Sequence, residues 1–188
     1  MQTAPMEQDM DSLVASFTSR GDIARLLRPG GVGVELGVAE GGFSERILKF
    51  SKLAYLYSID MWAGDRNHDI KEYLKAIHRL DPFRHRNSIL RMRFDEALPL
   101  FANGCLDFIY IDGYAHTGEE GGKTFYDWYP KLKSGGIIAG DDYHPDWPLT
   151  VAAVDKFIAA NNLKMYVINC TPEIDWASRY PTWFAYKP

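Results

Sequence analysis

A glycine-rich turn between an acid and a helical pattern is the segment of this chain best suited to hold a ligand. Its sequence, VELGVAEGGFSERIL at residues 34–48, contains Glu35, Gly37, Gly41 and Gly42. Glycine lets the backbone turn sharply and approach a ligand closely, and the first turn of a helix leaves N–H groups free to bind it. A pyrophosphate-binding turn has the spacing G-x-G-x-x-G, whereas this one reads E-x-G-x-x-x-G. The spacing therefore disfavours a nicotinamide-dependent oxidoreductase.

Acidic side chains in this turn favour a cationic ligand. Glu35 and Glu40 would repel a phosphate group and attract a positive charge. We expect Ser44 to cap the helix that follows, because its hydroxyl can accept a hydrogen bond from a free backbone N–H group.

A third acid, Asp60, follows an apolar run at residues 54–59. In nucleotide-binding α/β folds, an acid at the end of the second strand accepts hydrogen bonds from ribose hydroxyls. Met61 and Trp62 come next and are placed to flank an adenine ring. The alternative is that Asp60 only caps the following segment. Its distance from Glu35 and the glycines favours the ribose role.

Three further acids follow two apolar runs nearer the C-terminus. Asp112 ends the run LDFIYID, and Asp141 and Asp142 end the run GGIIAGDD. Ligands bind at the carboxyl ends of the strands in parallel sheets, so we expect these acids to converge there. Clustered carboxylates repel one another, and a hard cation such as Mg²⁺ relieves that repulsion. The alternative is that Asp141 and Asp142 form turns and caps, with Asp112 alone touching a cofactor amine.

Two histidines near these acids are candidate general bases. His116 lies in the loop DGYAHTGEE that follows the first acidic strand end, and an imidazole can take a hydroxyl proton near neutral pH. The alternative role is a surface histidine bonded to Glu119. His144 follows the acid pair and is the competing base or an extra metal ligand.

Strand and helix patterns must alternate along the chain to bring these residues together. Expected helices cover residues 9–27, 42–50, 69–80, 95–101, 122–132 and 148–160. Expected strands cover residues 33–36, 54–59, 88–92, 106–111, 136–139, 163–169 and 182–186. Such alternation predicts an α/β, Rossmann-like, doubly wound parallel sheet with helices on both faces.

The length and net charge of the chain predict its domain organisation and exclude some classes of binding partner. The chain has 188 residues and a net charge of −4, which predict one domain and disfavour a nucleic-acid backbone as partner. We expect a helical segment at residues 1–30 and a single domain at residues 31–188. No apolar stretch is long enough to span a membrane or to serve as a signal peptide, so we expect a cytoplasmic protein without membrane contact. Cys105 and Cys170 lack ligand spacing and are expected to be reduced.

The glycine turn resembles that of class I S-adenosylmethionine-dependent methyltransferases, whose cofactor carries an ammonium and a sulfonium group. The strand-end acids resemble the metal site of small metal-dependent O-methyltransferases of the catechol and macrolide-sugar types. The DGYAH loop is similar to the D-G-x-H segment of the same group, with the histidine one residue later. The resemblance covers nearly the whole chain. It implies a seven-stranded, mostly parallel sheet whose last strand is antiparallel.

The resemblance also implies roles for individual residues. Glu35 would hold the methionine end of the cofactor through the turn, and Asp60 its ribose. Close contacts and the adenine border would come from Gly37, Gly41, Gly42, Phe43, Met61, Trp62, Phe94 and Asp95. Asp112 would touch both the cofactor and, with Asp141 and Asp142, a Mg²⁺ ion.

The function that these patterns predict is methyl transfer from S-adenosylmethionine to a hydroxyl of a small molecule, assisted by Mg²⁺. Asp112, His116 and His144 are the candidate catalytic residues. Two alternatives stay open: a metal-free methyltransferase acting on nitrogen, whose acids bind a cationic acceptor, and a non-catalytic cofactor-binding protein on the same fold. The sequence leaves the acceptor and the oligomeric state open, a homo-oligomer included.

Overall fold

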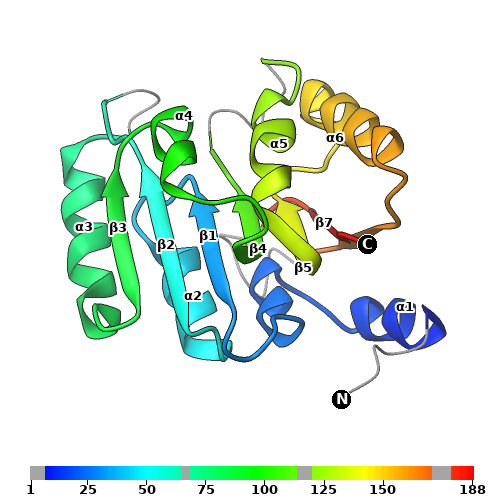
Figure 1. Cartoon of the computed structure of the whole chain (residues 1–188), viewed down its shortest axis with the longest axis horizontal. Helices are drawn as coiled ribbons and strands as arrows, with labels where there is room; N and C mark the ends of the chain where they lie inside the picture. The colour runs from blue at the N-terminus through cyan, green and yellow to red at the C-terminus, as the bar shows by residue number, and fades with distance from the viewer. Residues whose placement is uncertain (1–6, 65–67, 114–119, 171–178) are drawn as a thin grey trace.

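One seven-stranded sheet organises the chain (Figure 1). The computed structural model describes residues 7–64, 68–113, 120–170 and 179–188. The strands lie in the order β3-β2-β1-β4-β5-β7-β6. Their bounds are β1 Val32–Leu36, β2 Tyr55–Asp60, β3 Asn87–Arg91, β4 Leu106–Ile111, β5 Leu132–Gly140, β6 Met165–Ile168 and β7 Thr182–Tyr186.

Six of these strands run parallel, and β7 runs antiparallel between β5 and β6. The order reverses at β1, which pairs with β2 on one side and β4 on the other. In doubly wound folds a ligand binds at such a reversal, outside the carboxyl ends of the strands. The predicted Rossmann-like fold with an antiparallel last strand is confirmed.

Helices cover both faces of the sheet (Figure 1). Their bounds are α1 Glu7–Ala15, α2 Gly42–Phe50, α3 Ile70–Leu80, α4 Phe94–Ala97, α5 Lys123–Trp128 and α6 Pro148–Ala160. Buried residues of α1 and α2 pack in one hydrophobic cluster, and those of α4, α5 and α6 pack in another. Alternate β4 residues divide accordingly: Phe108 and Tyr110 face the first cluster, whereas Ile109 and Ile111 face the second. Both faces of β4 are therefore buried, as in other parallel sheets.

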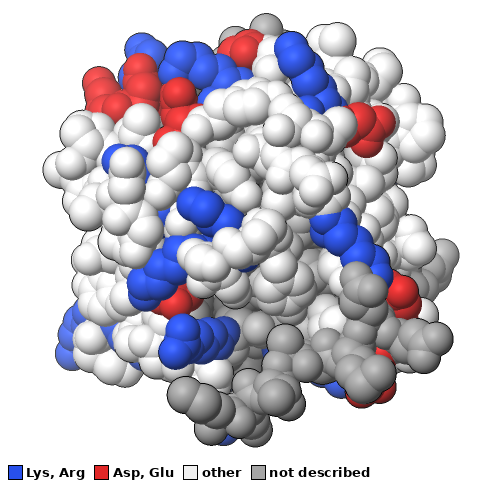
Figure 2. Space-filling view, turned by 45° about the vertical axis from the view of Figure 1, so that its right-hand side comes forward, with Lys and Arg blue, Asp and Glu red and all other residues white. Residues whose placement is uncertain are grey.

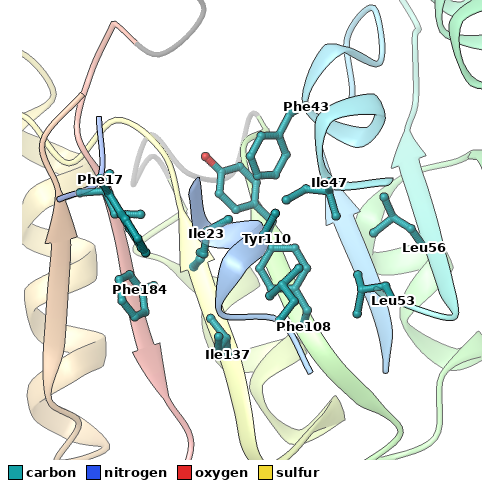
Figure 3. Packing of buried hydrophobic residues seen from close by; sticks show 14 of the residues in the cluster. Phe17, Ile23, Phe43, Ile47, Leu53, Leu56, Phe108, Tyr110, Ile137 and Phe184 are labelled. Atoms are coloured by element: carbon teal, nitrogen blue, oxygen red, sulfur yellow. The ribbon is translucent and has the colours of Figure 1, made fainter. Parts of the chain in front are cut away.

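The N-terminal segment completes the first of these clusters. Figure 3 shows Phe17 beside Phe184 of β7, and Ile23 beside Tyr110 of β4. Phe43 of α2 stacks on Tyr110, with 3.9 Å between the ring centroids. The described part of residues 1–30 thus packs against the same sheet as the rest of the chain.

The continuous helix expected at residues 9–27 is wrong. The chain forms α1, which ends at Ala15, and then a separate 3-10 helix, η1, at Arg20–Arg25. Between them, the Asp22 carboxylate accepts hydrogen bonds from the backbone N–H groups of Thr18 and Ser19, both at 3.0 Å. Such local side-chain bonds compete with the helix, and here they start a new one.

Two other helices are shorter than expected. α5 ends at Trp128 and α4 ends at Ala97, and each continues as one 3-10 turn containing a proline, Pro130 or Pro99. Proline cannot donate the backbone hydrogen bond that an α-helix needs in its interior. The expected cap of α2 also differs, because Gly41 is the N-cap and Ser44 lies inside the first turn. Within the described ranges, no helix is both long and apolar enough to cross a membrane.

Gly37 allows the ends of β1 and β4 to meet. Its φ is +97°, and a Cβ atom there would lie 1.9 Å from the carbonyl oxygen of Asp112. The same contact includes a 2.7 Å hydrogen bond from the Asp112 N–H group to the carbonyl of Leu36. A side chain at residue 37 would therefore force the two strand ends apart.

Substituting Gly37 by alanine should destabilise the protein more than the same change at Gly30. Both glycines have positive φ, but a Cβ at Gly30 meets nothing within 4 Å. Gly30→Ala should cost about 1–2 kcal/mol of unfolding free energy from backbone strain, and Gly37→Ala about 1–3 kcal/mol more from the steric clash. Urea denaturation of the ligand-free proteins measures both. Equal losses would show that the strand ends can separate freely.

Candidate active site

A cavity of about 1180 Å³ opens at the carboxyl ends of β1, β2 and β4. Most of the residues predicted to bind a cofactor line it: Glu35, Gly37, Gly42, Phe43, Asp60, Met61, Phe94, Asp95 and Asp112. These residues come from five separate stretches of the chain, and the sheet order brings them to one edge. The cavity therefore lies where the topology predicts a ligand site.

Asp60 organises the turn between β1 and α2. Its Oδ2 accepts hydrogen bonds from the backbone N–H groups of Val38 and Ala39, at 2.9 and 3.0 Å. Its Oδ1 accepts one from the N–H group of Trp62, at 3.2 Å. The carboxylate thus fixes the turn on one side and the segment after β2 on the other. The ribose role of Asp60 stays a prediction.

Two predicted cofactor residues, Trp62 and Gly41, do not line the cavity but support the turn from behind. Trp62 is 1% exposed, and its indole N–H donates to the carbonyl of Ala39 at 2.9 Å. Gly41 has a φ of +80°, and a Cβ there would lie 3.3 Å from the Cα of Ala76 in α3. Gly41 therefore allows α2 and α3 to approach each other.

Glu35 is buried in a chain of polar groups that crosses three strands. It accepts a hydrogen bond from the hydroxyl of Ser44, which lies 2.7 Å from the hydroxyl of Ser58. The amide of Asn87 in β3 donates to Ser58 at 2.9 Å. Ser44 therefore links the turn to the sheet instead of capping its helix.

Burial shifts the proton equilibrium of Glu35. Desolvation raises the pKa of its carboxyl group to about 8, the hydrogen bond from Ser44 opposes this rise, and the negative charge of Asp112 adds to it. Glu35 is therefore mostly protonated at neutral pH in the ligand-free protein. A cation bound in the cavity would favour its carboxylate form.

Arg20 of η1 joins the two predicted acidic strand ends. Its Nη1 donates to Oδ2 of Asp112 at 2.5 Å and to Oδ2 of Asp141 at 2.7 Å. The guanidinium carbon lies 5.1 Å from the ring centroid of Phe43. Thr182 of β7 donates to the other oxygen of Asp141 at 2.8 Å. The sequence analysis missed Arg20, because it lies in a stretch of ordinary amphipathic pattern.

The burial and the charges of this cluster shift the pKa values of both Asp141 and Arg20. Burial raises the pKa of Asp141 to about 7, although the positive charge of Arg20 opposes the shift. Burial also acts to lower the pKa of Arg20, but the negative charges of Asp112 and Asp141 outweigh it and leave that pKa well above its ordinary value. The arginine therefore stays charged throughout the range in which Asp141 titrates.

The predicted Mg²⁺ site at Asp112, Asp141 and Asp142 is not supported. In the described part of the chain, no group of three or more histidine, cysteine or acidic side chains is arranged to hold a metal ion. The positive charge between Asp112 and Asp141 is the guanidinium of Arg20. Asp142 follows them with a φ of +58°, in the left-handed region. The residues present therefore do not fit a divalent cation between these acids.

Of the two histidine candidates, only His144 belongs to the described part of the chain. His116 lies outside the described residues. His144 accepts a hydrogen bond from the backbone N–H group of Asp146 at 3.2 Å, its ring lies 5.1 Å from that of Tyr180, and it does not line the cavity. His68 does line the cavity and lies 2.7 Å from Glu72. The catalytic roles of His116 and His144 stay predictions.

Comparisons with known proteins agree with this geometry. Residues 34–143 match a family model described as a methyltransferase domain. A search of curated protein sequences found no match.

Solved structures of low sequence identity share the fold. A SAM-dependent O-methyltransferase from Thermotoga maritima is 16% identical with a TM-score of 0.65, and the match covers 99% of this chain and 67% of that one. A precorrin-6y C5,15-methyltransferase from Geobacter metallireducens is 14% identical with a TM-score of 0.65, covering 100% and 93%. A methyltransferase, described as putative, from Streptococcus mutans in complex with SAH is 12% identical with a TM-score of 0.60, covering 100% of both chains. Because the family model spans more than half of the sequence, the chain belongs to the methyltransferase domain family.

Proposed function

We propose that this methyltransferase transfers the methyl group of S-adenosylmethionine to a hydroxyl group of a small molecule. The observation that carries the proposal is the cavity at the strand ends, which brings the glycine turn, Glu35 and Asp60 together with Asp112. The cofactor supplies a methyl group on a positively charged sulfur. The protein binds and orients the two reactants, and such positioning accounts for much of the rate of a direct transfer.

The charges along the cavity suit this cofactor. Glu35 and Asp60 accept hydrogen bonds but form no salt bridge within the described part of the chain. Asp60 therefore offers its carboxylate to a cationic ligand, and Glu35 gains a negative charge when such a ligand lowers its pKa. Met61 and Phe94 line the same cavity and offer apolar surface for adenine. The turn held by Asp60 would meet the polar parts of the cofactor.

The charges near Asp112 favour a neutral acceptor over a cationic amine. Arg20 offsets part of the negative charge of Asp112 and Asp141, so these acids attract a cation less strongly than an unpaired acid pair would. An ionised Asp112 can still accept a hydrogen bond from an acceptor hydroxyl. Lysine and arginine side chains form several separate groups on the face shown in Figure 2. Together with the net charge of −4, this arrangement favours a small acceptor over a nucleic acid.

Turnover with methyl-labelled S-adenosylmethionine tests the proposal. The protein is incubated with phenols, catechols and sugars in one panel and with amines in another, each with and without EDTA. We expect labelled methyl ethers that form equally well in EDTA. Label on amines alone would contradict the choice of a hydroxyl acceptor. Cofactor binding without turnover on either panel would indicate a non-catalytic binding protein.

Replacing Asp60 by alanine should weaken cofactor binding. The change removes the acceptor that holds two N–H groups of the turn. It also removes the acceptor proposed for the ribose hydroxyls, where charged hydrogen bonds contribute roughly 1.5–3 kcal/mol each. We therefore expect the dissociation constant for S-adenosylmethionine to rise at least about tenfold by calorimetry. Asp81→Ala is the control, because Asp81 is exposed and does not line the cavity. Unchanged affinity in Asp60→Ala would remove Asp60 from the binding site.

Cofactor binding should release a proton from Glu35. Because the pKa of Glu35 is about 8 in the free protein, a cationic ligand that lowers it displaces a proton at pH 7. Affinity should therefore rise with pH up to about 8, and Glu35→Gln should flatten that rise. Calorimetry in buffers of different ionisation enthalpy measures the proton directly. Glu40→Gln is the control for the pH dependence. Glu40 also lines the cavity, but its hydrogen bond from Lys75 lowers its pKa, so Glu40 does not titrate near pH 8.

The same shift predicts how stability depends on pH without any ligand. Glu35 binds a proton more tightly in the folded state than in the unfolded state, whose pKa is near 4.5. Its contribution is fully present below pH 4.5 and is lost as the pH rises through about 8. The difference in unfolding free energy between wild type and Glu35→Gln should therefore change by a few kcal/mol, on the order of 1.4 kcal/mol per pKa unit, across this range. A constant difference would contradict the assigned pKa.

A further inference from the structure

Arg20 lies between two of the acids at which the sequence pattern predicts a metal ion. A single nitrogen of its side chain contacts two carboxylates, at 2.5 Å for Asp112 and 2.7 Å for Asp141. All three side chains are largely buried, with 14%, 22% and 9% of their surfaces exposed. Two buried carboxylates this close together need a positive charge between them.

We propose that Arg20 is the built-in counter-ion of Asp112 and Asp141, and that it takes the place of a divalent cation at these strand ends. An arginine stays charged at every pH at which the protein is folded. A divalent cation would have to displace the guanidinium, because two positive charges cannot share the same pair of oxygens without strong repulsion. The protein therefore needs no metal ion to keep the two acids together.

Packing of the N-terminal segment fixes the arginine in this position. Phe17 on one side and Ile23 on the other are buried in the core, so the chain on both sides of Arg20 is anchored. The guanidinium lies against the ring of Phe43, which itself stacks on Tyr110. The backbone that carries Arg20 is therefore held in place, and the ring of Phe43 lies against the guanidinium.

Arg20 thereby acts as a positioning residue for Asp112. The backbone of Asp112 is held by its N–H bond to Leu36, and its carboxylate by the bond from Arg20. Asp112 and Arg20 both line the cavity, whereas Asp141 does not. The buried Asp141 thus supports Arg20, and Arg20 in turn holds Asp112 at the wall of the cavity.

Manganese binding to the free protein tests this assignment without cofactor or acceptor. The loss of the free Mn²⁺ signal in electron paramagnetic resonance reports binding, and the thermal midpoint with and without Mg²⁺ gives a second readout. We expect wild type and Arg20→Lys to show no site in either measurement. Arg20→Ala should bind Mn²⁺ about tenfold or more tightly than wild type, because the competing charge is gone. The double variant Arg20→Ala with Asp141→Asn should lose most of this gain.

Stoichiometric Mn²⁺ binding by the wild type would overturn the assignment, and so would a folded Arg20→Ala that gains no binding. If Arg20→Ala does not fold, the folding of Arg20→Met and Arg20→Lys is compared to test whether a positive charge is required at residue 20. Folding of the lysine variant alone, with no Mn²⁺ site in wild type, supports a required positive charge, whereas equal folding of both contradicts it. A wild type that binds no Mn²⁺ and methylates nothing would contradict the proposed function while leaving the role of Arg20 supported.

Discussion

The structure at the carboxyl ends of the strands depends on the buried contact between the guanidinium of Arg20 and the carboxylates of Asp112 and Asp141. Asp112 and Asp141 follow neighbouring parallel strands, so the topology itself forces two negative charges together. Breaking such a buried pair by removing one partner usually costs several kcal/mol, because an uncompensated charge remains. Arg20 therefore stabilises the two strand ends against the repulsion between their acids. The walls of the cavity depend on the same contact.

In a second buried network, the acid is uncharged instead of being paired with a cation. Glu35 accepts a hydrogen bond from Ser44, whose hydroxyl in turn contacts that of Ser58. Within the described residues no arginine contacts Glu35 directly, and its carboxyl group holds a proton at neutral pH. At one end of the cavity, Arg20 offsets part of the negative charge of two acids. At the other end, Glu35 becomes charged when a cation binds beside it. A cationic cofactor and a neutral acceptor would each meet the environment that suits it.

Much of this arrangement could be predicted from the sequence, because it depends on local patterns. Glu35, Asp60 and Asp112 end or follow apolar runs, and the carboxyl ends of parallel strands share one edge. The role of Arg20 could not be predicted in this way, since no local pattern distinguishes an arginine in an amphipathic stretch from a solvated one. The prediction of one helix at residues 9–27 was wrong because a side-chain contact decides the structure there. The Asp22 carboxylate accepts a hydrogen bond from the backbone N–H group of Ser19 and starts a new turn.

The long sequence separation within the charge cluster has a consequence for how the protein is made. Arg20 precedes Asp112 by 92 residues and Asp141 by 121 residues. During synthesis, the N-terminal segment leaves the ribosome long before either acid exists, and contacts between distant residues also form late in folding. Until β4 and β7 are made, Ile23 and Phe17 lack the residues beside which they pack, Tyr110 and Phe184. The nascent chain therefore carries an exposed hydrophobic segment for most of its translation.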